Sequence, residues 1–149
     1  MSLTWTEHDY DSMSWHDATV HAIRLVEGEH GSGQLWFDLD YIVEWICVGN
    51  TCRFRVAPAR LAFREVTKLR LSLDYATVGA GFVPFQLDGI ERKDIRYAGD
   101  YSSYSWTIEI NWPDGSISFD SPGFTQQLTG PIVESGSQSL SPSQRRCNP

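Results

Sequence analysis

The alternation of apolar and polar residues predicts strands along most of this chain. The clearest example is residues 14–39, which predict one β-hairpin around a glycine-rich turn at residues 27–33. Side chains of a strand alternate between its two faces, so every second residue shares a face. The second strand of this hairpin therefore buries one apolar row: Leu35, Phe37, Leu39 and Tyr41.

The first strand of the same hairpin changes phase. Ala18 and Val20 alternate on one face, and the apolar residues that follow are displaced by one position. A β-bulge near His21 and Ala22 would return them to a single buried face.

The middle of the chain is less regular. Residues 42–48 are apolar nearly throughout, which predicts a segment covered on both faces. Phe54 and Val56 then alternate with arginines in a short strand that we expect to end before Pro58. Residues 61–73 fit two strands joined near residues 65–68, or a helix with one apolar side. The strict alternation over residues 68–75 favours strands.

The second half of the chain contains another strong hairpin pattern. Tyr104 to Trp112 alternate, Pro113-Asp114-Gly115 predicts the turn, and the return strand begins at Ile117. Before it, residues 77–84 predict a glycine-rich connection and residues 85–97 a loop with one short element. After it, residues 124–128 predict a final edge strand.

These segments predict a single, mainly β domain spanning residues 1–149. Short strands separated by frequent turns are typical of an antiparallel β-sandwich or a curved, partly closed sheet, here of about eight strands. Residues 1–13 are interpreted as a polar N-terminal arm, and residues 135–149 as a loosely ordered tail rich in serine, glutamine and proline.

The chain is acidic, with a formal net charge of -7 and a pI near 4.9. This argues against a nucleic-acid partner, because binding phosphate requires many lysine and arginine contacts. A basic protein fits better as a partner, although the charge also serves solubility alone. No apolar run reaches membrane-spanning length and no basic-then-apolar leader is present, so we expect a cytoplasmic protein without membrane contact.

Three cysteines, an odd number, suit a reducing compartment better than a disulfide framework. Cys47 and Cys52 could face each other across a hairpin and form a disulfide. Free buried thiols are the favoured interpretation. A zinc site would need further ligands at recognisable spacing, and the next cysteine is Cys147.

His16, Asp17 and His21 form the first candidate site, because imidazole and carboxylate groups are good metal ligands. Such a site would suit a small metal-dependent hydrolase. The spacing matches no established metal motif, so structural roles at the strand entrance and the bulge are favoured.

Asp38 and Asp40 form the second candidate, with Trp36 beside them on the same strand face. The two carboxylates lie about 7 Å apart along the strand. They could serve as acid and base in glycoside hydrolysis if their pKa values differed. An exposed acidic face with an aromatic anchor equally describes a docking surface for a basic protein.

The run Ser14-Trp15-His16-Asp17-Ala18, followed by Val20, Ile23 and Leu25, resembles the opening motif of bacterial immunity proteins of polymorphic toxin systems and of related uncharacterised families. The resemblance covers about twelve residues. It implies a cytoplasmic protein that neutralises a toxin domain without catalysis or cofactor.

The sequence thus predicts non-catalytic protein binding through Trp36, Asp38 and Asp40, with no cofactor. A metal-dependent hydrolase using His16, Asp17 and His21 is the alternative. A carbohydrate-binding sandwich is a third possibility, resting on the aromatic residues and the fold class.

Overall fold

The computed structural model describes residues 3–76, 79, 81–96 and 102–145. Tyr97, Cys147 and parts of the 77–84 connection and of the tail lie outside these residues. The described chain forms nine strands, a short 3-10 helix and one helical turn. They are β1 (Thr4–Thr6), η1 (Glu7–Ser12), β2 (Thr19–Glu27), β3 (Gly33–Val48), β4 (Thr51–Leu73), β5 (Phe85–Arg96), β6 (Ser102–Trp112), β7 (Gly115–Ser121), β8 (Gly123–Leu128), β9 (Val133–Ser135) and α1 (Pro142–Arg145).

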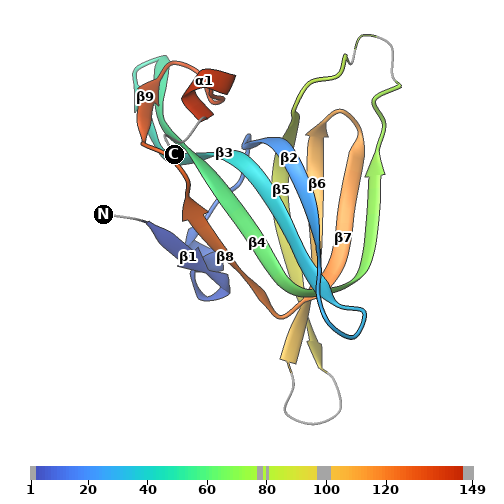
Figure 1. Cartoon of the computed structure of the whole chain (residues 1–149). Helices are drawn as coiled ribbons and strands as arrows, with labels where there is room; N and C mark the ends of the chain where they lie inside the picture. The colour runs from blue at the N-terminus through green and yellow to red at the C-terminus, as the bar shows by residue number, and fades with distance from the viewer. Residues whose placement is uncertain (1–2, 77–78, 80, 97–101, 146–149) are drawn as a thin grey trace.

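All strands belong to one antiparallel sheet, which confirms the mainly β prediction. The order is β1-β8-β4-β3-β2-β5-β6-β7, and β7 pairs in turn with β4, so the sheet partly closes into a ring (Figure 1). The long strand β4 closes the ring, because it lies third in this order and also pairs with the last strand, β7. Its first half pairs with β3 and β8, and its second half pairs with β7.

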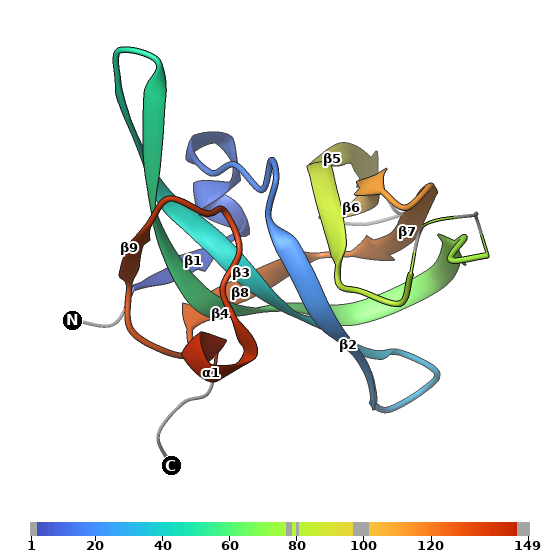
Figure 2. The same cartoon turned by 90° about the horizontal axis from the view of Figure 1, so that it is seen from above.

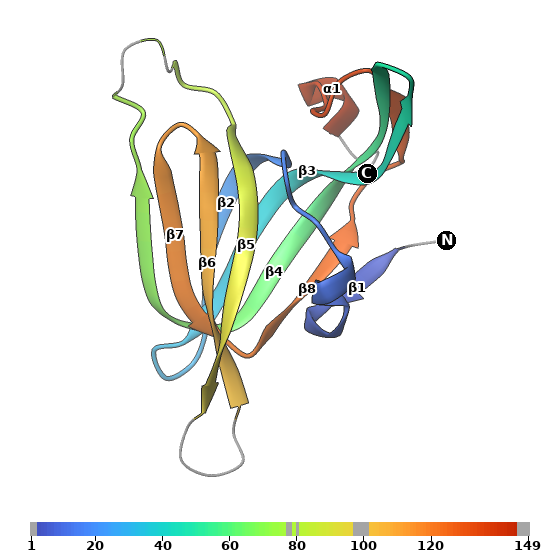
Figure 3. The ribbon, with the colours of Figure 1, turned by 180° about the vertical axis from the view of Figure 1, so that it is seen from behind.

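The partly closed sheet has two layers with the core between them. In Figure 1 the front layer holds β8, the first half of β4, β3 and β2, while β5, β6 and β7 lie behind it. Figure 2 shows both layers from above, and Figure 3 shows the rear strands. Large side chains fill the interior, including the fully buried Phe37, Phe63, Trp106 and Phe119. Phe63 packs edge-on against the rings of Trp106 and Phe119, which joins the layers.

The predicted hairpin of residues 14–39 is confirmed as β2 and β3. The predicted bulge is also confirmed, because the register between these strands shifts between Val20 and Ala22. Beyond the bulge, Ile23 lies opposite Phe37 and Leu25 opposite Leu35, so all four face the interior.

Residues 61–73 are strand, as favoured, but they belong to one long strand. Glu65 and Lys68 both have positive φ, 48° and 57°, and the register shifts between Thr67 and Arg70. The expected join at residues 65–68 is therefore the point where β4 exchanges partners. The expected end before Pro58 was wrong, since β4 continues through Pro58 opposite Asp40.

Residues 85–96 were predicted to be mostly loop, and this was wrong. They form β5, which pairs with β6 along its length. Register shifts between Gln86 and Gly89 interrupt the alternation that would have revealed a strand. The hairpin of β6 and β7 is confirmed. Residues 124–128 are a strand as expected but not an edge, because β8 pairs with both β1 and β4.

The far ends of β3 and β4 form a projecting hairpin that departs from two expectations. Residues 42–48 were expected to be covered on both faces, yet Trp45 and Val48 are exposed. Cys47 lies directly opposite Cys52, and the two form a disulfide on the exposed tip. The prediction of free buried thiols was wrong, because the register places the two side chains together.

Described residues of the N-terminal arm and of the C-terminal tail contact the sheet. The arm contains β1, which pairs with β8, and η1, whose Tyr10 hydroxyl donates to the Ile90 carbonyl. In the described part of the tail, Leu140 is buried against Ile42, Phe54 and Val56. Among the described residues, no helix has the length and apolarity needed to cross a membrane.

Candidate functional site

Asp38 and Asp40 lie on the outer face of β3, but they do not form an exposed acidic surface. Arg60, opposite Asp38 on β4, donates two hydrogen bonds to its carboxylate, of 2.8 and 3.3 Å. The Asp40 side chain is 0% exposed and accepts hydrogen bonds from Arg145 and from the Leu140 N–H. The expected exposure was therefore wrong for Asp40, because the tail covers it and neutralises its charge.

Trp36 occupies the same outer face between two guanidinium groups. Arg60 lies 4.5 Å from the ring centroid and Arg24, its neighbour on β2, lies 5.6 Å away. The Trp36 indole N–H donates to Gln34. Two guanidinium groups thus lie against the Trp36 ring, which differs from the acidic setting that the sequence predicted.

The structure does not assemble His16, Asp17 and His21 into a metal site. His16 Nε2 lies 3.5 Å from Asp17 Oδ2, and His16 Nδ1 lies 3.0 Å from the Asp88 carbonyl oxygen. His21 lies at the bulge of β2, where burial and then the charge of Arg145 lower its pKa despite the opposing effect of Asp40. The described residues contain no group of three histidine, cysteine, aspartate or glutamate side chains that could hold a metal ion.

The Trp-His-Asp-Ala run instead connects several elements of the fold. The buried Trp15 indole donates to Gln126 on β8 at 2.8 Å. Asp17 has a φ of 64°, donates its N–H to the Leu87 carbonyl and accepts a bond from Gln138 in the tail. Packing and hydrogen bonding within the fold therefore give Trp15 and Asp17 of this run structural roles.

A site that the sequence did not predict lies on one side of the molecule. We define the open groove as the gap between residues 22–27 of β2 and residues 67–73 of β4. Among the described residues, β2 beyond Val20 pairs only with β3. In the same part of the chain, residues 67–73 of β4 pair only with β7. Within the described chain, each segment therefore has one unpaired edge, and the gap is seen at the right of Figure 1.

Two cavities lie along the open groove. The lower, about 490 Å³, is lined by residues of β2 such as Leu25 and of β4 such as Leu69. The upper, about 470 Å³, is lined by Ile23, Leu73 and Phe82 among others. From the upper cavity to the lower one, residue numbers rise along β2 and fall along β4. The two strand edges therefore run in opposite directions.

Apolar side chains are exposed along the open groove. Leu25 is 66% exposed, Leu71 47% and Phe82 95%, and Val83 beside it is half exposed. Leu71 lies opposite the buried Ile117, so it faces the interior side of the sheet and is nevertheless open to solvent. Exposed apolar residues that gather at one place mark interaction sites more often than scattered ones do.

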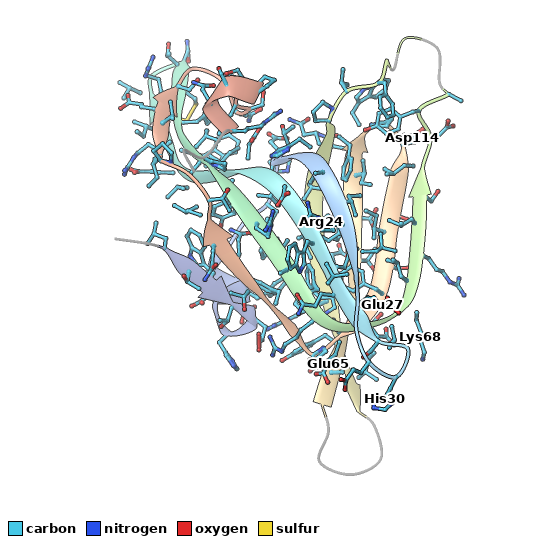
Figure 4. All side chains as sticks on the ribbon, viewed as in Figure 1. Arg24, Glu27, His30, Glu65, Lys68 and Asp114 are labelled. Atoms are coloured by element: carbon cyan, nitrogen blue, oxygen red, sulfur yellow. A yellow bond between two sulfur atoms is a disulfide. The ribbon has the colours of Figure 1, made fainter. Side chains whose placement is uncertain are left out.

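The outer rim of the open groove is basic at its centre. Arg24 on β2 and Arg70 on β4 point outward from the two edges, and both lie between the levels of the two cavities. Neither guanidinium has an ion pair with another described residue. Figure 4 shows Arg24 on this face, with Glu27 and Lys68 at the lower end of the groove.

The sequence contained part of this signal. The alternation of Leu69, Leu71 and Leu73 was visible, but it predicts a buried face and gives no indication that nothing covers it. The unpaired edges depend on strand order, which a single sequence does not show.

No family model, curated protein or solved structure matches this chain.

Proposed function

We propose that this protein is a non-catalytic binding module that holds a segment of a partner protein in the open groove. The observation that carries the proposal is the exposure of Leu25, Leu71 and Phe82 beside two unpaired strand edges. Folded proteins normally cover or blunt such edges, because they pair readily with other chains. A partner strand would cover both the edges and the leucines.

The proposal keeps the predicted protein binding but moves the contact surface. Asp38 and Asp40 are paired with Arg60 and Arg145, which leaves little negative charge for a basic partner at Trp36. The resemblance to immunity proteins stays a prediction. A toxin domain would be one kind of partner compatible with binding through the groove.

The first experiment captures the partner by photo-crosslinking. Phe82 is replaced by p-benzoylphenylalanine, an aromatic substitution at an exposed position, and the product formed in source cells is identified by mass spectrometry. The same residue at Val48 is the control, because Val48 is 76% exposed on the distant hairpin tip. We expect a specific product from position 82 that is absent from position 48.

The second experiment measures affinity for the purified partner. A Leu25→Ser/Leu71→Ser variant should weaken binding about tenfold or more, since removing central apolar contacts costs over about 1.4 kcal/mol. Val48→Ser should bind as the wild type does. Equal affinity of the wild type and the double variant would refute binding through the open groove.

A further inference from the structure

We infer that the open groove binds an extended segment by β-strand addition, and that this segment alternates apolar with acidic residues. The inference rests on the proposed function and specifies its binding mode and ligand. Three independent features support it: the main-chain edges, the cavities and the rim charges.

The main chain supplies the first argument. Residues 22–27 of β2 and residues 67–73 of β4 each direct unpaired N–H and C=O groups toward the same gap. Only an extended backbone presents donors and acceptors at the spacing of a strand edge. Because the two edges run in opposite directions, a single inserted strand would lie antiparallel to one and parallel to the other.

The interior of the groove supplies the second argument. Successive side chains of an added strand point alternately inward and outward. Inward ones would meet Ile23, Leu25, Leu69 and Leu73, where cavities of about 490 and 470 Å³ provide room. Branched apolar side chains match these walls and this space.

The rim supplies the third argument. Outward side chains near the middle of the added strand would lie between Arg24 and Arg70, whose guanidinium groups have no ion pair within the described residues. Acidic side chains complement these charges, whereas lysines would be repelled. The net charge of the chain, -7, also disfavours a second copy of itself as the occupant.

The probe for the experiment is a fluorescein-labelled synthetic peptide of alternating valine and glutamate, titrated by anisotropy. We expect saturable binding to the wild type and about fivefold weaker binding to an Arg24→Ala/Arg70→Ala variant, as for two partly exposed ion pairs. An Arg53→Ala variant, altered on the distant hairpin, should bind as the wild type does. A valine–lysine peptide should bind more weakly than the valine–glutamate peptide.

N-methylation tests the strand itself. Methyl groups on the amides of every valine, or of every glutamate, remove the edge donors and leave the side chains unchanged. We expect one or both methylated peptides to lose about tenfold or more in affinity, because the lost main-chain bonds leave edge carbonyls unpaired. Amide exchange in residues 22–27 and 67–73 should slow when the unmethylated peptide binds.

Several results would overturn the inference: no saturable binding, undiminished binding of both methylated peptides, or preference for the lysine peptide. A wild-type dimer in sedimentation that Leu25→Ser/Leu71→Ser abolishes would identify a second copy as the occupant and would also overturn it. If the crosslinked partner still requires Leu25 and Leu71 while methylation has no effect, the proposed function stands and only the strand mode fails.

Discussion

Glu7 is a carboxylate buried between the N-terminal arm and the sheet. It accepts hydrogen bonds of 2.9 and 2.6 Å from Arg64, and Arg92 donates to its backbone carbonyl. A Cβ on Gly123 would overlap the Glu7 carboxylate in its present position, so glycine leaves room for the pair as it is placed. Burial acts to raise the pKa of Glu7, but the hydrogen bonds and charge of Arg64 outweigh it and lower the pKa overall.

This pair predicts loss of stability in acid. Because the folded pKa lies below the unfolded value, the contribution is present above about pH 4.3 and is lost as the pH falls through the folded pKa. Glu7→Gln should cost about 1–3 kcal/mol of unfolding free energy at pH 7, as for a hydrogen bond to a charged group. Urea unfolding at pH 7 and pH 3.5 measures both effects.

The neighbouring Asp9→Asn variant serves as the control, since Asp9 caps η1 without an arginine partner among the described residues. The wild type should have a higher unfolding free energy at pH 7 than at pH 3.5. Glu7→Gln should reduce this difference more than Asp9→Asn does. Equal narrowing by both variants would contradict the role assigned to Glu7.

At the residue scale, the sequence predicted which faces side chains occupy better than it predicted their partners. Alternation correctly placed Leu35, Phe37 and Leu39 inside and Asp38 and Asp40 on the opposite face. It could not show that Arg145, separated from Asp40 by 105 positions, would cover that carboxylate. Pairing over such a separation depends on the path of the tail across the sheet.

At the element scale, β4 illustrates how one strand serves two layers. Its bend at residues 65–68 uses positive φ at two non-glycine residues, Glu65 and Lys68 (Figure 4). The backbone at Glu65 therefore stores conformational strain of about 1 kcal/mol, because side chains other than glycine rarely adopt this region.

Glu65→Gly should leave the unfolding free energy unchanged or raise it by up to about 1 kcal/mol, since glycine adopts positive φ without strain. Glu65→Val should lower it by about 1–2 kcal/mol, since β-branching adds steric conflict at positive φ. Urea unfolding compares the two variants. A more stable valine than glycine variant would contradict this account of the bend.

The disulfide at the hairpin tip is a second element-scale feature. It closes a loop of sequence separation 5, so removing it should cost about 2 kcal/mol or less in the chain-entropy model. A Cys47→Ser/Cys52→Ser variant tests this by urea unfolding without altering Cys147. We expect crosslinking from position 82 to persist, because the tip and the open groove involve different elements. Loss of crosslinking in a folded variant would show that they are coupled.

Elements were predicted where the alternation was unbroken or changed phase only once. The β2–β3 and β6–β7 hairpins and the bulge at His21 followed from apolar phase and turn residues. The sequence failed at β5, whose irregular register hides the alternation, and at Pro58, which β4 accommodates between β3 and β8. In both places pairing with neighbouring strands overrides local preference.

At the scale of the whole molecule, the two layers of the sheet leave an opening on each of two sides. These two openings differ in what covers them. One side is filled by the N-terminal segment, which runs from β1 and η1 to the start of β2 (Figure 3). There Trp15 packs against Phe124, and Tyr10 packs against Trp106. The other side is the open groove, where Leu71 and Phe82 face solvent. Within its described residues, the chain thus covers one open side with its own aromatic residues and leaves the opposite side uncovered.

This asymmetry predicts unequal costs for truncating apolar side chains on the two sides. Trp15→Ala should lower the unfolding free energy by about 3–5 kcal/mol, because it removes a 3% exposed ring and leaves a cavity. Leu71→Ala should cost about 1 kcal/mol or less, because much of that side chain is already in water. Urea unfolding gives both values, with Val48→Ala on the hairpin tip as the exposed control. If Leu71→Ala lowered the unfolding free energy as much as Trp15→Ala does, Leu71 would belong to the folded core. That result would contradict the proposal that the open groove is a binding surface.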